Sequence, residues 1–230
     1  MYNRNYQMSD SQTRSFMQKV YGWMAAGLSI TALIAYMVAS SPKAISVVAT
    51  MPAMIVLVLL QLGLVFYLSM ALQRLSASAA MGIFIAYAAL TGVTMSTIFL
   101  AFTGASIALT FAVTAGMFTA MALYGYFTDS DLSSLGSFLM MGVIGLVIAN
   151  VVNMFVQSAN FDLVTAAFGV MIFTLFTAYD TQMIKRLGGE MIGDGEEVSK
   201  VAVIGSLKLY LDFINLFIYL LRFFGQRRND

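Results

Sequence analysis

The chain has 230 residues, of which 60% are hydrophobic and only 10% are charged, and its formal net charge is +1. About a quarter of the residues of a soluble domain carry charge, so this composition is typical of a polytopic membrane protein. The near-neutral balance argues against a nucleic-acid partner, and the absence of His and Cys excludes disulfides, thiol nucleophiles, His-ligated zinc or haem, and Ser/His hydrolases. Nearly all residues are needed for membrane spans, so we expect one membrane domain over 1–230.

Seven apolar runs are each long enough to cross a hydrocarbon core of about 30 Å as a helix. They cover about 21–40, 45–72, 79–102, 106–127, 137–157, 162–184 and 203–225. The second run is long for one crossing and contains Pro52, and we interpret it as one tilted or kinked helix. The predicted fold class is therefore an all-α polytopic membrane protein with seven transmembrane helices.

Lys and Arg are unevenly distributed between the two sides that seven spans define. With the N-terminus inside, the cytoplasmic set is Arg4, Arg14, Lys19, Arg74, Lys185, Arg186 and Lys200, and the outer set is Lys43, Arg222, Arg227 and Arg228. Positive residues are enriched on the cytoplasmic side of membrane proteins. This distribution predicts a cytoplasmic N-terminus and a C-terminus outside.

The run at 203–225 carries a carboxylate, Asp212, close to its middle. At about 100° per residue, its strongly polar side chains fall within a sector of roughly 80° on a helical wheel. These side chains are Lys208, Asp212, Asn215, Tyr219 and Arg222. The rest of the surface is apolar, so this polar stripe is expected to face protein or water.

A second carboxylate, Asp180, lies on the sixth run, five residues before Lys185 and therefore about 8 Å inside the cytoplasmic boundary. If Lys208 extends to that same boundary, Asp212 lies about 6 Å deeper, so the two carboxylates have similar depths. Two aspartates about 4 Å apart repel by about 4 kcal/mol at an effective dielectric near 20, and we expect them to share a proton near neutral pH. Arg74, on the same side, would favour their ionised form.

A purely structural interpretation of these carboxylates stays open at this point. Lys208 and Asp212 are one helical turn apart and can simply pair, while Asp180 can pair near Lys185. Against this, ionisable groups inside a membrane are costly and usually functional.

Three further polar residues lie within the apolar runs, namely Gln61, Asn150 and Asn153. Such side chains are typical of hydrogen bonds between membrane helices, and they are alternatively candidate pore or supporting residues together with Lys208 and Asn215. The acidic residues of the predicted loop at 186–200 lack the spacing of an EF-hand, which favours a solvated loop. The sequence therefore assigns no metal ligands.

The motifs 177-TAYDTQ-182 and 209-LYLDFINLFIYLLRFFG-225, with 91-TGVTMSTI-98, resemble the Bax inhibitor-1 (transmembrane Bax inhibitor motif) family, in particular its bacterial members. The resemblance extends from about residue 14 to the end of the chain. It implies six helices packed around a central seventh, and a pH-sensitive calcium leak controlled by an aspartate pair. Asp180 and Asp212 match that pair, and Arg74 matches an arginine that interacts with it. Many relatives carry a glutamate where this chain has Gln61, which puts in doubt an ion-binding role there.

The expected function is thus a pH-sensitive calcium leak channel or cation exchanger, not an enzyme, in a bacterial inner (plasma) membrane. Calcium and protons are its expected ions, and no cofactor is expected.

An intramembrane aspartyl protease is an alternative, because Tyr179-Asp180 resembles one of its motifs. However, Asp212 follows Leu-Tyr-Leu rather than Gly-x-Gly, and a later Pro-Ala-Leu is impossible because the only prolines are Pro42 and Pro52. A regulatory partner of membrane proteases or cell-death proteins is another alternative, since lipid-embedded binding surfaces leave no motif.

Overall fold

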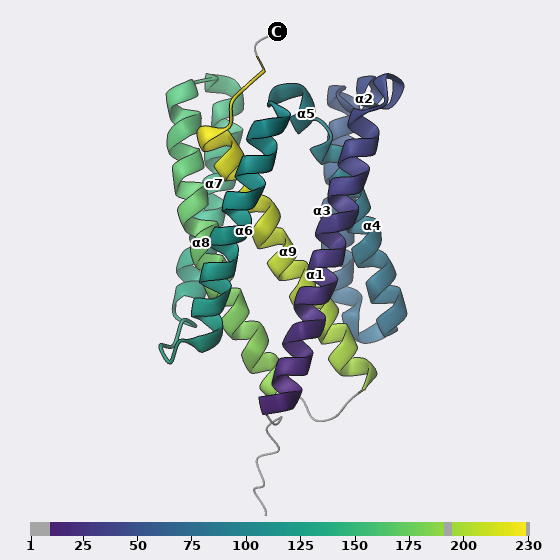
Figure 1. Ribbon diagram of the computed structural model, residues 1–230, viewed down its shortest axis with the longest axis vertical. Helices are drawn as coiled ribbons and strands as arrows, with labels where there is room; N and C mark the ends of the chain where they lie inside the picture. The colour runs from purple at the N-terminus through teal and green to yellow at the C-terminus, as the bar shows by residue number, and fades with distance from the viewer. Residues whose placement is uncertain (1–9, 191–194, 229–230) are drawn as a thin grey trace, which may run out of the picture. The chain divides into compact units, whose positions relative to one another are not determined.

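The computed structural model describes residues 10–190 and 195–228, and within these ranges its regular elements are helices (Figure 1). In chain order they are α1 (Asp10–Ala39), α2 (Pro42–Val48), α3 (Met51–Ala71), η1 (Leu72–Arg74), α4 (Ala77–Met95), α5 (Ile98–Ala101), α6 (Gly104–Phe127), α7 (Leu135–Val156), α8 (Ala159–Glu190) and α9 (Glu196–Phe224). Seven segments of the described chain are long and apolar enough to cross a membrane: α1, α3 with η1, α4 with α5, α6, α7, α8 and α9. The all-α prediction with seven transmembrane helices is confirmed.

The prediction of one helix over 45–72 is wrong at its beginning. α2 ends at Val48, and α3 begins at Met51 after the N-cap residue Thr50. Pro42 and Pro52 each lie in the first turn of a helix. A backbone N–H in the first turn has no acceptor within the helix, so proline loses no hydrogen bond there, and its fixed φ angle suits a helix. Pro52 therefore starts a new helix instead of kinking a continuous one.

The connection between the last two helices is shorter than the predicted loop at 186–200. α8 continues to Glu190 and α9 begins at Glu196. Lys208 is therefore twelve residues into α9, and its side chain is exposed. These helix bounds do not locate the membrane boundary, so the reach of Lys208 to that boundary and the depth of Asp212 stay predictions.

The helices form two compact units, which we describe separately. The first comprises residues 1–101 and 186–210, and the second comprises residues 102–185 and 211–230. α9 contributes its N-terminal half to the first unit and its C-terminal half to the second. It is also the most buried of the seven spans: 61% of the residues in an apolar 18-residue stretch of α9 are buried, against 6% in the corresponding stretch of α3. The packing of six helices around it involves both units together and stays a prediction.

In the first unit, α4 packs against both α1 and α3 (Figure 1). The α1–α4 approach is close: a Cβ added at Gly92 would lie 2.7 Å from the backbone oxygen of Thr31. The hydroxyl of Thr31 donates to the carbonyl of Ala88 at 2.9 Å and lies 2.6 Å from the hydroxyl of the fully buried Tyr210 on α9. Small residues and hydroxyls thus join α1, α4 and α9, as is common where membrane helices pack without water.

In the second unit, aromatic rings line the contact between α6 and α9. The ring of Phe213 meets Phe111 and Phe118 edge to face, with centroid distances of 5.4 and 5.5 Å. On another side of α9, Tyr219 stacks on Phe173 of α8, with centroids 5.7 Å apart. Such pairs add about 0.5–1.5 kcal/mol each beyond the area they bury, so they fix the C-terminal half of α9 against its neighbours.

Candidate functional site

Asp180 of α8 and Asp212 of α9 both lie inside the second unit, where their side chains are 6% and 4% exposed. A buried carboxylate is costly unless it is protonated or interacts favourably with its surroundings. Both groups can bind a proton and attract a cation. Among the described residues, no group of three or more acidic side chains is arranged to hold a metal ion.

The segment of α8 around Asp180 is held closely by its neighbours. A Cβ added at Gly125 of α6 would lie 2.2 Å from the backbone oxygen of Ala178. On the other side of Asp180, the buried Gln182 donates to the carbonyl of Ser130 at 2.8 Å and accepts from the backbone N–H of Leu132 at 2.9 Å. α6 and the loop after it thus fix the position of this part of α8.

Phe213, the residue after Asp212, makes the aromatic contacts with Phe111 and Phe118 that are described above. Asn215, on the same polar stripe, is half-buried, and its Nδ2 donates to the carbonyl of Leu211 within α9 at 2.8 Å. Asn215 therefore helps to satisfy the backbone of its own helix, and its predicted pore role stays a prediction.

The predicted residues Arg74, Lys208 and Gln61 belong to the first unit. Arg74 ends η1 and is exposed, as is Lys208. Gln61 connects α3 with α4: its Nε2 donates to the hydroxyl of Thr94 at 3.2 Å, and its Oε1 accepts from the hydroxyl of Thr91 at 3.4 Å. This geometry fits a hydrogen bond between membrane helices, and the action of Arg74 on the aspartates stays a prediction.

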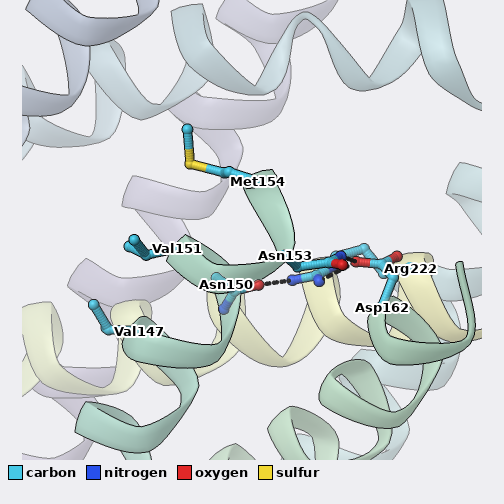
Figure 2. Close-up of a pocket in the computed structure, with 7 residues that line it drawn as sticks. All are labelled: Val147, Asn150, Val151, Asn153, Met154, Asp162 and Arg222. Atoms are coloured by element: carbon cyan, nitrogen blue, oxygen red, sulfur yellow. Dashed lines mark hydrogen bonds and ion pairs between the residues drawn. The ribbon is translucent and has the colours of Figure 1, made fainter. Parts of the chain in front are cut away.

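A second polar cluster joins α7, α8 and α9 in the second unit (Figure 2). Arg222 forms an ion pair with Asp162, and its Nη1 donates to Oδ1 of Asn150 at 2.9 Å. The Nδ2 of Asn150 donates to the hydroxyl of Tyr219 at 3.1 Å. Asn153 accepts from the backbone N–H of Ser158 at 3.1 Å. The Nδ2 of Asn153 also donates to Oδ1 of Asp162 at 3.4 Å, so Asn150 and Asn153 both bond between helices, and Asn153 shapes the α7–α8 turn as well.

Asp162 is the member of this cluster that sequence analysis missed. It lies at the edge of the sixth apolar run, where a charged residue next to a membrane boundary is ordinary. Its partner, Arg222, is 60 residues away in sequence. The only signal in the sequence was that each residue lies near the end of an apolar run on the same predicted side.

The family described as "Inhibitor of apoptosis-promoting Bax1" matches residues 13–229 of the chain. The chain belongs to the Bax inhibitor-1 family. The match covers the seven spans, including both helices that carry the buried aspartates. The resemblance inferred from the motifs of these helices is therefore confirmed at the level of the family.

Bacterial relatives align with this chain over nearly their whole length. The chain is 46% identical to the inner membrane protein YbhL of Escherichia coli strain K12, over 94% of this chain and 93% of that protein. It is 48% identical to a protein of Borreliella burgdorferi over the same shares of the two chains. It is 36% identical to a membrane protein of Streptococcus pyogenes serotype M3, over 98% of this chain and 97% of that protein. This Bax inhibitor-1 family member is an integral membrane protein.

Proposed function

We propose that this protein conducts calcium across its membrane as a pH-sensitive leak channel or exchanger, and that Asp180 and Asp212 are its proton-sensing groups. The observation that supports this most directly is the burial of both carboxylates within one unit. The chain has no His, the side chain that usually changes charge between about pH 5 and 8. A response in that range therefore depends on carboxylates or on the N-terminal amine.

Protons and calcium would compete for the same oxygens in this mechanism. Ionised carboxylates repel each other and attract Ca²⁺, which prefers oxygen ligands, whereas protonation removes both effects. The C-terminal half of α9 carries Asp212, and its aromatic contacts are the interactions that any movement of this helix has to rearrange. Neither a bound cofactor nor an enzymatic step is needed.

Calcium flux into liposomes that contain the purified protein tests this proposal. We expect dye-reported flux to exceed that of protein-free liposomes and to change strongly between about pH 6 and 8, because a shared proton couples the two carboxylates. Flux equal to that of protein-free liposomes at every pH would contradict the calcium conductance. Flux without a pH response would remove only the sensing role of the aspartates.

We also propose the inner membrane as the location, as the name of the relative YbhL states for that protein, with the N-terminus in the cytoplasm. The cysteine-free chain makes this orientation directly testable. Single variants Ser130→Cys, in the loop between α6 and α7, and Ser199→Cys, near the start of α9, should react with an impermeant thiol reagent only from the cytoplasmic side, because positive residues favour that side for these two segments. Asn229→Cys, outside the described residues, should react only from the other side. Cytoplasmic labelling of Asn229→Cys would contradict the orientation.

A further inference from the structure

A pocket of about 450 Å³ lies beside the turn between α7 and α8, within the second unit (Figure 2). Part of its wall is apolar and comes from α7, namely Val147, Val151 and Met154, which are 58%, 50% and 64% exposed. In a membrane-spanning helix, apolar side chains with such exposure face lipid chains unless another protein covers them. The pocket therefore has a wall suited to an acyl chain.

The other part of the wall is polar and is formed by Arg222, Asp162, Asn150 and Asn153. The Arg222 and Asp162 side chains are 23% and 21% exposed, so a ligand can reach the ion pair. Within the described residues, Arg222 donates one N–H to Asn150 and one to Asp162, and a guanidinium has five such donors. The second carboxylate oxygen of Asp162 accepts no hydrogen bond from a described residue. The ion pair thus retains donors on one partner and an acceptor on the other.

These polar groups lie close to the ends of their helices. Arg222 is two residues before the end of α9, Asp162 is three residues after the start of α8, and Asn153 is three residues before the end of α7. At about 1.5 Å per residue they are about 3–5 Å from the helix ends. The 22 residues of α7 extend about 33 Å, close to the thickness of the hydrocarbon core, so Arg222, Asp162 and Asn153 lie within a few ångströms of the boundary between the hydrocarbon and the lipid headgroups.

We propose that this pocket binds a phosphoethanolamine group, supplied by a membrane phospholipid. The phosphate accepts hydrogen bonds from the remaining N–H groups of Arg222, and the ammonium donates a hydrogen bond to Asp162. The acyl chain follows the apolar wall on α7. The pocket carries one positive and one negative group, which complements a zwitterion. Phosphatidylglycerol would bring an anion close to Asp162 and no ammonium to donate to its second carboxylate oxygen, and the choline of phosphatidylcholine has no N–H to donate to the carboxylate.

Lipid retention tests this site on the full chain. The protein is equilibrated in nanodiscs with equal amounts of phosphatidylethanolamine, phosphatidylcholine and phosphatidylglycerol, then extracted, and the retained lipid is measured by native mass spectrometry. We expect preferential retention of phosphatidylethanolamine. Arg222→Gln and Asp162→Asn should each lower that retention about tenfold, the effect of losing one charge-assisted hydrogen bond. Arg227→Gln removes a positive charge from an exposed residue just after α9 and should retain lipid like the wild type.

A second kind of variant tests the pocket without breaking the ion pair, so that a loss of folding cannot explain the result. Val151→Trp fills the pocket from its exposed side and leaves the polar cluster intact, so it should lose the bound lipid while keeping the thermal stability of the wild type. Equal retention of the three lipids, or full retention by Val151→Trp, would overturn the proposal. If soluble glycerophosphoethanolamine displaces the lipid as effectively as phosphatidylethanolamine does, the apolar wall contributes nothing and the assignment to a membrane lipid is overturned.

Discussion

Asp180→Asn and Asp212→Asn are each expected to remove most of the pH dependence of calcium flux between about pH 6 and 8. Asparagine keeps the size and hydrogen-bonding capacity of the side chain but cannot change its charge. If the two buried carboxylates share a proton, the loss of either one removes the coupled titration. The measurement is calcium flux into liposomes across a pH series, with the fold of each variant checked by circular dichroism.

The double variant and a matched control make this test specific. Asp180→Asn combined with Asp212→Asn should resemble the single variants, because groups that act as one switch are not additive. Asp129→Asn removes an exposed carboxylate from the loop after α6 in the same unit and should keep the wild-type profile. If both single variants stay folded and keep that profile, the aspartates are structural. If the wild type cleaves membrane peptides and both variants do not, the protease alternative replaces the channel.

The seven helices could be predicted because a long apolar run in the sequence directly indicates a membrane-spanning helix. Helix ends were harder, because a helix can continue beyond the apolar run into polar residues. α1 begins at Asp10 although its apolar run begins near 21, and α9 begins at Glu196 although its run begins near 203. Neither extension interrupts the run, so hydropathy does not report it. The break before Met51 was missed because Pro52 suits both a kink and a first turn.

The candidate site was partly visible in the sequence for a similar reason. An acid inside an apolar run is rare, so Asp180 and Asp212 stood out, and their burial in one unit agrees with that signal. The ion pair of Asp162 with Arg222 depends on how α8 and α9 pack, which a single sequence does not record. Likewise, the sequence shows that Gly125 is small but not that the backbone of α8 lies against it.

Gly125→Ala is the stability change with the largest expected effect. The new Cβ would lie 2.2 Å from the oxygen of Ala178 and 2.8 Å from its carbonyl carbon. Both are backbone atoms, so no side-chain rotation relieves the clash and α6 or α8 has to move. Overpacking of this kind typically costs about 1–3 kcal/mol, and we expect a lower midpoint of thermal unfolding in detergent.

The same substitution also connects helix packing with the proposed proton sensor. Asp180 is two residues after Ala178, so a displaced α8 should shift the pH midpoint of calcium flux as well. Gly116→Ala is the matched control on α6: an added Cβ meets no atom within 4 Å, and the residue is exposed. Because alanine favours helices over glycine by up to about 1 kcal/mol, this control should be as stable as the wild type or slightly more so. Equal stability of the two variants would contradict the close approach of α6 to α8. A destabilised Gly125→Ala with an unchanged pH midpoint would separate this packing from proton sensing.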